Sequence, residues 1–233
     1  MQKLNLKGDF MAETGAKKEK EATEEQPIKG LRKLSVVSLM FFLISFLGWC
    51  MEMIYCSSWF TDFDDRGFLT LPFCVIYGTP LCLVFLLLGT PKEGFLAGSI
   101  EKTRLKKGVK IFLRYALYFL LSAGIATLFE LVFGLLFDSL GVRLWSYRRF
   151  PLNYKGYVCL YFSLLWGTLI TLSMSTFFNP LYRTLARIPH RAAMIINLVL
   201  WVAVIADFSF NIVYLLREGH HFELIFFLWS GFL

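Results

Sequence analysis

The sequence predicts an all-α fold, a polytopic membrane helical bundle of about five transmembrane helices. Of the 233 residues, 57% are hydrophobic and the mean hydropathy is +0.59, whereas soluble domains contain about 45–50% apolar residues. Five apolar stretches reach the roughly 20 residues that a helix needs to cross the hydrocarbon core. Two of these stretches contain no charge, and the other three contain one acid and no base.

The predicted spans follow one another with short connections. They cover residues 34–56, 71–89, 115–137, 156–178 and 192–216. Helices are the expected form, because an open strand would leave backbone groups without hydrogen bonds in lipid. The sequence therefore predicts one transmembrane bundle over residues 34–216.

The two ends of the chain differ from this bundle. Residues 1–33 are mixed in charge and poor in large apolar side chains, which is typical of a disordered tail. They lack the apolar core and cleavage site of a cleaved signal peptide. Residues 217–233 include an apolar stretch that is too short to span. We expect it at the extracellular side, either in the interface or re-entering the bundle.

The distribution of basic residues predicts the orientation. Lys and Arg number eight in residues 1–33, seven in 89–114 and three in 179–191, which leaves six of the 24 for the other side. Basic residues stay in the cytoplasm. The sequence therefore predicts a multi-pass protein of the cytoplasmic membrane with its N-terminus inside. The net charge of +7 has this explanation, so the expected partner is the lipid bilayer and not nucleic acid.

Three carboxylates inside the spans are the candidate functional residues. Glu52, Glu130 and Asp207 lie roughly 6, 10 and 14 Å below the outer ends of their predicted helices. A charge in hydrocarbon costs several kcal/mol unless it faces protein or a wet cavity. Small or polar residues share the helical face of each acid, including Asn211 beside Asp207. We expect Glu52, Glu130, Asp207 and Asn211 to line a substrate or ion path.

A short pattern recurs 89 positions further along the chain. Arg66-Gly67-Phe68 precedes Tyr77-Gly78, and Lys155-Gly156-Tyr157 precedes Trp166-Gly167 at the same spacing. Each copy follows a span that carries a glutamate. The pattern indicates a parallel internal repeat of two helices, although short apolar motifs also recur by chance.

Six residues near the outer side are candidates for gating or pairing. They are Arg66, Gly67, Gly78, Arg143, Lys155 and Gly156. Glycine permits a sharp turn or a close backbone approach. The bases could pair with the glutamates or anchor the chain at the interface. Gly78 and Pro80 interrupt the second span, which marks either a binding site, as in transporters, or a packing kink.

Several ordered motifs resemble one known family. They are Phe46-Leu-Gly-Trp49 with Glu52, Tyr55 and Cys56, Arg66-Gly-Phe-Leu69, Pro72-Phe-Cys74, Ile76-Tyr-Gly78, Leu128-Phe-Glu130, Arg143-Leu-Trp145-Ser-Tyr147, Gly156, Cys159-Leu160 and Leu164-Leu-Trp-Gly167. Over about residues 35–180 the chain is similar to the type IV family of bacterial ABC-transporter permeases. It departs from the family pattern at Thr70-Leu71, where Asn-Gly is usual, at Val75, where proline is usual, and at Lys155, where asparagine is usual.

The resemblance implies transport, and it also implies an ATP-binding subunit on another chain. The sequence itself has no G-x-x-x-x-G-K-[ST] phosphate loop. Residues 179–191 carry leucines and an isoleucine on one helical face with arginines nearby. This segment is either a coupling element for such a subunit or an amphipathic helix on the membrane surface. A second copy of the same chain, forming a homo-oligomer, is another candidate partner.

No catalytic, metal or cofactor site is predicted. The three histidines lack metal-ligand spacing, and the five cysteines lie in or beside spans, where buried thiols pack as small apolar groups.

Transport of a small solute or ion is the preferred function, with substrate, direction and energy source unassigned. The alternatives are a membrane enzyme that uses Glu52 and Glu130 as acid and base, and a non-catalytic scaffold whose acids pair with Arg66 and Arg143.

Overall fold

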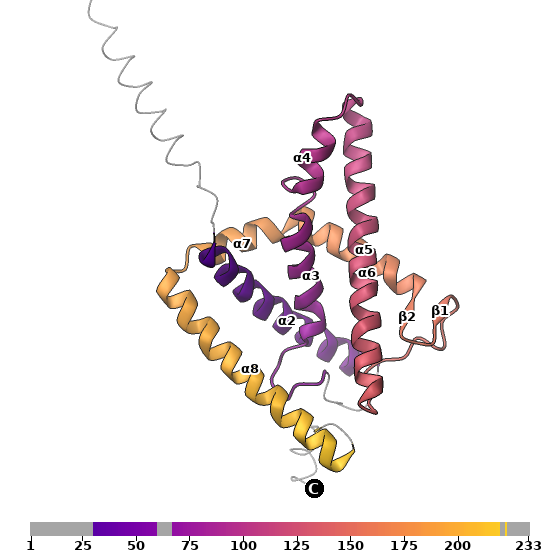
Figure 1. The fold of residues 1–233 in the computed structure, drawn as a ribbon, viewed down its shortest axis with the longest axis vertical. Coiled ribbons are helices and arrows are strands. Elements are labelled where there is room, and N and C mark those ends of the chain that lie inside the picture. The colour runs from indigo at the N-terminus through magenta and orange to yellow at the C-terminus, as the bar shows by residue number, and fades with distance from the viewer. Residues whose placement is uncertain (1–29, 60–66, 220–221, 223–233) are drawn as a thin grey trace, which may run out of the picture. The chain divides into compact units, whose positions relative to one another are not determined.

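A computed structural model describes residues 30–59, 67–219 and 222, without the side chains of residues 55–59 (Figure 1). Nearly all of the predicted tail and most of residues 217–233 therefore lie outside the described residues. The predicted all-α membrane fold is confirmed. The helices are α2 (Leu31–Trp59), α3 (Val75–Leu88), α4 (Phe95–Glu101), α5 (Lys107–Ser139), α6 (Leu160–Thr176), α7 (Phe178–Ala186) and α8 (His190–Glu218). A hairpin of β1 (Asn153–Tyr154) and β2 (Val158–Cys159) precedes α6.

Three of the described helices are long and apolar enough to cross a membrane, namely α2, α5 and α8. A fourth crossing exists if α6 and α7, which bend by 53° at their junction, count as one span. Helix α3 has 14 residues and measures roughly 21 Å, which is less than the roughly 30 Å of hydrocarbon. The predicted second span is thus only partly helical, because residues 71–74 are irregular.

Contacts between the helices give their relative directions. Tyr77 meets Glu52, and Cys82 meets the Val37 carbonyl, so α3 runs antiparallel to α2. Ser122 of α5 meets Thr171 of α6, and Glu130 of α5 meets Trp166 of α6, so α6 runs antiparallel to α5. Helix α8 runs parallel to α2. Asn197 donates to Ser35, and one turn later Trp201 Nε1 donates to Ser38 Oγ at 2.8 Å.

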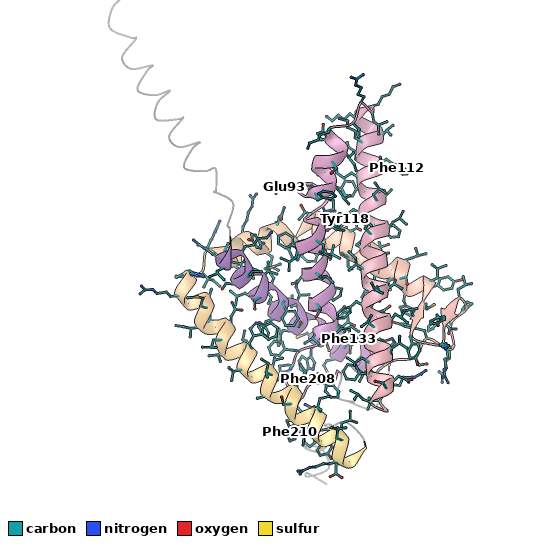
Figure 2. The ribbon with its side chains drawn as sticks, in the orientation of Figure 1. Glu93, Phe112, Tyr118, Phe133, Phe208 and Phe210 are labelled. Carbon is teal, nitrogen blue, oxygen red and sulfur yellow. The ribbon has the colours of Figure 1, made fainter. Side chains whose placement is uncertain are left out.

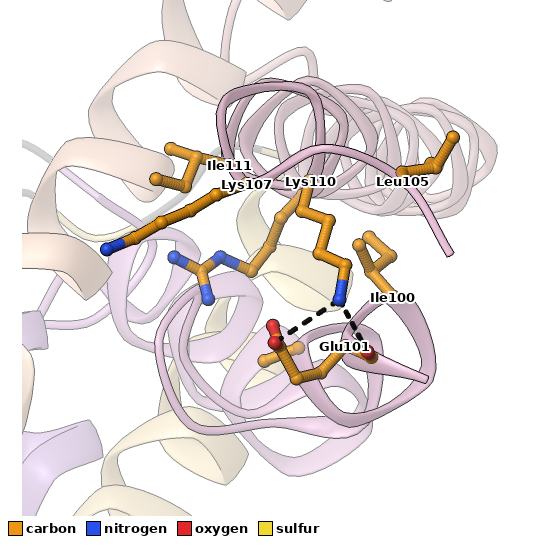
Figure 3. A pocket seen from close by; sticks show the side chains of 8 residues that line it. Ile100, Glu101, Leu105, Lys107, Lys110 and Ile111 are labelled. Atoms are coloured by element: carbon orange, nitrogen blue, oxygen red, sulfur yellow. Dashed lines mark hydrogen bonds and ion pairs between the residues drawn. The ribbon is translucent and has the colours of Figure 1, made fainter. Parts of the chain in front are cut away.

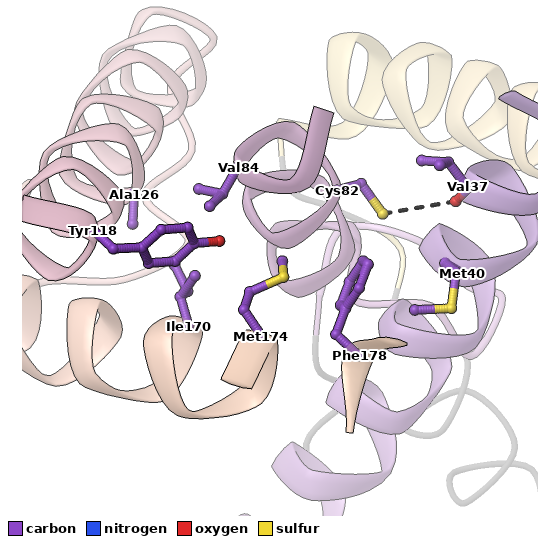
Figure 4. Packing of buried hydrophobic residues seen from close by; sticks show 9 residues of the cluster. All are labelled: Val37, Met40, Cys82, Val84, Tyr118, Ala126, Ile170, Met174 and Phe178. Atoms are coloured by element: carbon purple, nitrogen blue, oxygen red, sulfur yellow. Dashed lines mark hydrogen bonds between the residues drawn. The ribbon is translucent and has the colours of Figure 1, made fainter. Parts of the chain in front are cut away.

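A buried apolar core joins five helices (Figure 4). Its members are Val37, Met40, Cys82, Val84, Tyr118, Ala126, Ile170, Met174 and Phe178. Lipid tails are as apolar as these side chains, so close packing stabilises such a core more than transfer from water does. The amphipathic helix α7 places Leu181, Tyr182 and Leu185 against this core. Leu181 and Leu185 of the apolar face predicted within residues 179–191 therefore pack against the bundle.

Helix α5 is longer than the predicted span. Its 33 residues extend over roughly 50 Å, well beyond the thickness of the hydrocarbon. The hydropathy pattern begins at residue 115, but Lys and Arg are good helix formers and continue the helix back to Lys107. Apolar side chains of α5 and α8, such as Phe112, Phe208 and Phe210, are exposed (Figure 2) and suit contact with acyl chains.

Candidate functional site

Glu52 is held by an aromatic side chain from α3. The Tyr77 hydroxyl donates a hydrogen bond of 2.7 Å to Glu52 Oε1. Gly48, one turn earlier on α2, makes room for the ring. A Cβ at Gly48 would lie only 2.7 Å from Tyr77 Cγ. The Cys74 thiol is a distant second donor, with Sγ 3.9 Å from Oε2.

Glu130 receives two donors on the same oxygen. Trp166 Nε1 and the Tyr147 hydroxyl each donate to Glu130 Oε1 at 2.9 Å. The residue is only 5% exposed, and its Oε2 has no hydrogen-bond partner among the described residues. Buried polar atoms usually have a partner, so this oxygen marks a place where a further polar group would be stabilised.

The two glutamates are connected through their donors. The rings of Tyr77 and Trp166 meet edge to face with centroids 5.7 Å apart. We call Glu52, Tyr77, Trp166, Glu130 and Tyr147 the acid cluster. In the part of the chain that the structure describes, no Lys or Arg forms an ion pair with either glutamate. The carboxylates of the acid cluster therefore accept hydrogen bonds from neutral groups.

Two glycines bring the donors to the acids. Gly78 of α3 lies against Ser45 Oγ and the Phe41 carbonyl, which would be 2.6 Å from an added Cβ. Gly167 of α6 lies in the same way against Ala123 and Phe119 of α5. Tyr77 and Trp166 each come one position before these glycines. The close helix approach therefore places each aromatic donor beside a glutamate.

The hairpin before α6 positions Tyr147. Its turn has two consecutive residues with positive φ, Lys155 at 51° and Gly156 at 81°, as a type I′ turn requires. The Gly156 carbonyl accepts the Tyr147 backbone N–H at 2.9 Å, and the Asn153 side chain accepts the Gly156 N–H. Burial and the nearby Glu130 carboxylate raise the pKa of Tyr147 above its ordinary value, which keeps the hydroxyl a donor.

Arg143 pairs with Asp138, an acid at the edge of a predicted span that the sequence pattern does not mark. Its guanidinium contacts Asp138 Oδ1 at 2.7 and 3.1 Å, and Asp138 Oδ2 accepts the Tyr157 hydroxyl. The hydrogen bond to Asp138 raises the pKa of Tyr157. The structure thus places Arg143 in a contact that ties the C-terminal end of α5 to the hairpin. The Lys155 ammonium lies 5.7 Å from the Tyr154 ring, and Arg66 is outside the described residues.

Asp207 contacts the irregular segment 67–74 and not the acid cluster. Its two oxygens accept hydrogen bonds from the Thr70 hydroxyl and, at 3.1 Å, from the Leu71 N–H. Asn211 is fully buried and donates to the Asp207 carbonyl at 3.0 Å and to Oδ1 at 3.3 Å. Gly67 has φ +99°, which favours glycine. These contacts hold non-helical backbone inside the bundle, where its N–H groups need acceptors.

The sequence pattern marks the acids but not the side chains that donate hydrogen bonds to them. Tyr77 and Trp166 were detectable, since they occupy the same position in the two copies of the pattern. Tyr147 had no comparable signal, because its contact depends on the path of the hairpin. Within the described residues, no group of three or more His, Cys, Asp and Glu could hold a metal ion, and no disulfide joins the four cysteines whose side chains are described.

Comparison with known proteins identifies one family. The family model described as "Putative ABC-transporter type IV" matches residues 39–212. This range covers more than half of the chain and includes every residue of the acid cluster. Searches of the curated proteins and of the solved structures found no match.

Proposed function

The chain belongs to the type IV ABC-transporter family, and from this premise we propose that it is the membrane-embedded part of a transport system for a cation or for protons. The path passes the acid cluster, with Glu52 and Glu130 as the residues that receive the transported charge. Asp207 and Asn211 fix the segment 67–74 beside it. Gly67, Gly78, Lys155 and Gly156 set the backbone geometry around the path.

The observation that carries the proposal is the lack of a basic partner for either glutamate among the described residues. Buried charges are normally paired, and intramembrane carboxylates commonly mark ion pathways and proton relays. In the acid cluster the donors are a phenol, an indole and a second phenol. A positive partner for the carboxylates is therefore expected to come from the transported species.

The equivalent contacts of the two glutamates support the internal repeat. Helices α2 and α3 form one unit, α5 and α6 the other, and α8 completes a bundle of five membrane elements. Glu52 and Glu130 are 78 positions apart, Tyr77 and Trp166 are 89 apart, and in both units the aromatic donor contacts the glutamate of its own unit. Two units of the same orientation bring both acids toward a shared centre.

Transport assays on the full-length protein test the proposal. Proteoliposomes that contain the purified chain, with any ATP-binding subunit that co-purifies, are challenged in turn with gradients of protons, Na⁺ and K⁺. We expect Glu130→Gln to lower flux at least tenfold without loss of insertion. The matched control is Glu218→Gln, which changes an exposed acid at the end of α8. Normal flux from a Glu52→Gln/Glu130→Gln double variant would reject the path.

The scaffold and enzyme alternatives predict other results. The Asp138–Arg143 ion pair and the Asp207 contacts are of the kind that a scaffold would contain. If the chain is a scaffold, glutamate variants should leave all fluxes unchanged and affect only complex assembly. If it is an enzyme, the purified chain should convert a lipid or cell-wall substrate without a gradient or nucleotide.

A further inference from the structure

We propose that a basic cavity between α4 and the start of α5 binds a phosphate group, and that this phosphate is the headgroup of an anionic phospholipid. The cavity has a volume of about 410 Å³. Its polar lining consists of Lys107, Lys110 and Arg114 from α5 and Glu101 from the end of α4. This site is separate from the acid cluster, and the proposal does not depend on the transport function.

The three bases share one face of α5. Their spacing of three and four residues is that of neighbouring turns of a helix. Lys110 is only 17% exposed, and its ammonium is fixed by the Glu101 carbonyl at 2.7 Å and the Glu101 carboxylate at 3.3 Å. Figure 3 shows this link from α5 down to the end of α4. Lys110 therefore closes one side of the cavity at a defined position.

The other two bases are not neutralised by the described chain. The Arg114 guanidinium lies 5.6 Å from the Tyr115 ring, but its buried Nε has no hydrogen-bond partner among the described residues. Lys107 has no acid within ion-pair distance in the described ranges. Three cations thus surround the cavity with one carboxylate. Like charges on neighbouring turns repel, and a bound anion with several acceptor oxygens would relieve that repulsion.

The position along α5 favours a lipid over a soluble phosphate. The bases lie in the part of α5 that extends beyond the predicted span, at the end that the positive-inside rule places in the cytoplasm. Leu105 and Ile111 line the same cavity and are exposed, so they can contact the glycerol and upper acyl region. Basic pockets at this level of a membrane protein are suited to anionic headgroups.

Native mass spectrometry of the full-length protein tests the site. The protein is exchanged into detergent with phosphatidylglycerol or phosphatidylcholine as the probe. We expect one retained phosphatidylglycerol per chain and no comparable retention of phosphatidylcholine. Lys107→Gln/Arg114→Gln should lower the retention of phosphatidylglycerol at least tenfold, since each base near an anionic lipid contributes substantially to binding.

A matched variant separates this site from general surface charge. Lys102→Gln/Lys106→Gln removes the same charge from the same connection, but neither residue lines the cavity, so it should retain the lipid. Competition by inorganic phosphate at millimolar concentration, with loss in the Lys107→Gln/Arg114→Gln variant, would support the phosphate site but assign it to a soluble anion. Equal retention in both double variants would overturn the proposal.

Discussion

The two helix pairs α2–α3 and α5–α6 use the same contact in different surroundings. In each pair an aromatic donor, one position before a buried glycine, reaches a glutamate on the longer helix. Glu130 has two strong donors on one oxygen and is buried, whereas Glu52 has one strong donor and is half-buried. The comparison indicates that a common scaffold supports one firmly held acid and one more accessible acid.

The difference comes from the connection within each pair. Between α5 and α6 the hairpin turn holds the Tyr147 backbone, and the Tyr147 hydroxyl donates to Glu130. Between α2 and α3 the described segment 67–74 contains no equivalent hydroxyl donor to Glu52. Its Thr70 hydroxyl donates instead to Asp207 of α8. In the α5–α6 pair the connection completes the acid site, and in the α2–α3 pair it attaches α8.

Removing the two acids should have unequal effects on stability. Glu130→Ala leaves the Tyr147 hydroxyl and Trp166 N–H unpaired in a buried site, at a cost of about 1–3 kcal/mol for each unsatisfied group. Glu52→Ala leaves one half-buried hydroxyl, which should cost about 1 kcal/mol. Thermal unfolding in one detergent measures both variants. Equal losses would show that the two sites do not differ as described.

Adding a methyl group at the two glycines tests the scaffold itself. In Gly78→Ala the new Cβ meets the Phe41 backbone oxygen at 2.6 Å, and backbone cannot move aside easily. In Gly167→Ala the nearest atom is the Ala123 Cβ at 2.7 Å, with the Phe119 carbonyl at 3.2 Å. We expect losses of about 2–3 and 1–2 kcal/mol respectively. The same unfolding assay measures them, and the reverse order would contradict the described packing.

The sequence predicted the features that depend on local chemistry. An acid in an apolar stretch and a glycine at a fixed spacing are visible without coordinates, and Glu130 and Gly78 both lie at buried contacts. The irregular entry to α3 was not predicted, because an apolar stretch without charges looks the same whether or not its first residues are helical. The role of Asp138 was not predicted, because a charge at the edge of a span costs little free energy and is common there.

Deleting a single hydroxyl should sharpen the comparison of the two acids. Among the described residues, Tyr77→Phe removes the only strong donor to Glu52, whereas Tyr147→Phe leaves Trp166 on Glu130. Double-mutant cycles with the matching glutamate-to-glutamine change should give coupling of about 1 kcal/mol for each pair, within the range of buried hydrogen bonds in membranes. Coupling across units, between Tyr147 and Glu52, should be near zero. A large cross-unit term would show that the two sites act as one.

The smallest expected effect concerns the hairpin turn, which only the second unit contains among the described residues. Lys155 has φ 51°, a conformation that is unfavourable for lysine and readily adopted by asparagine or glycine. Lys155→Asn should therefore stabilise the protein by about 0.5–1 kcal/mol. It should leave any Glu130-dependent flux unchanged, because the turn's carbonyl contact to Tyr147 is made by the neighbouring Gly156. Lys155→Val, with a β-branched side chain at the same φ, should be destabilising, and a stable valine variant would show that the turn does not hold this conformation in the membrane.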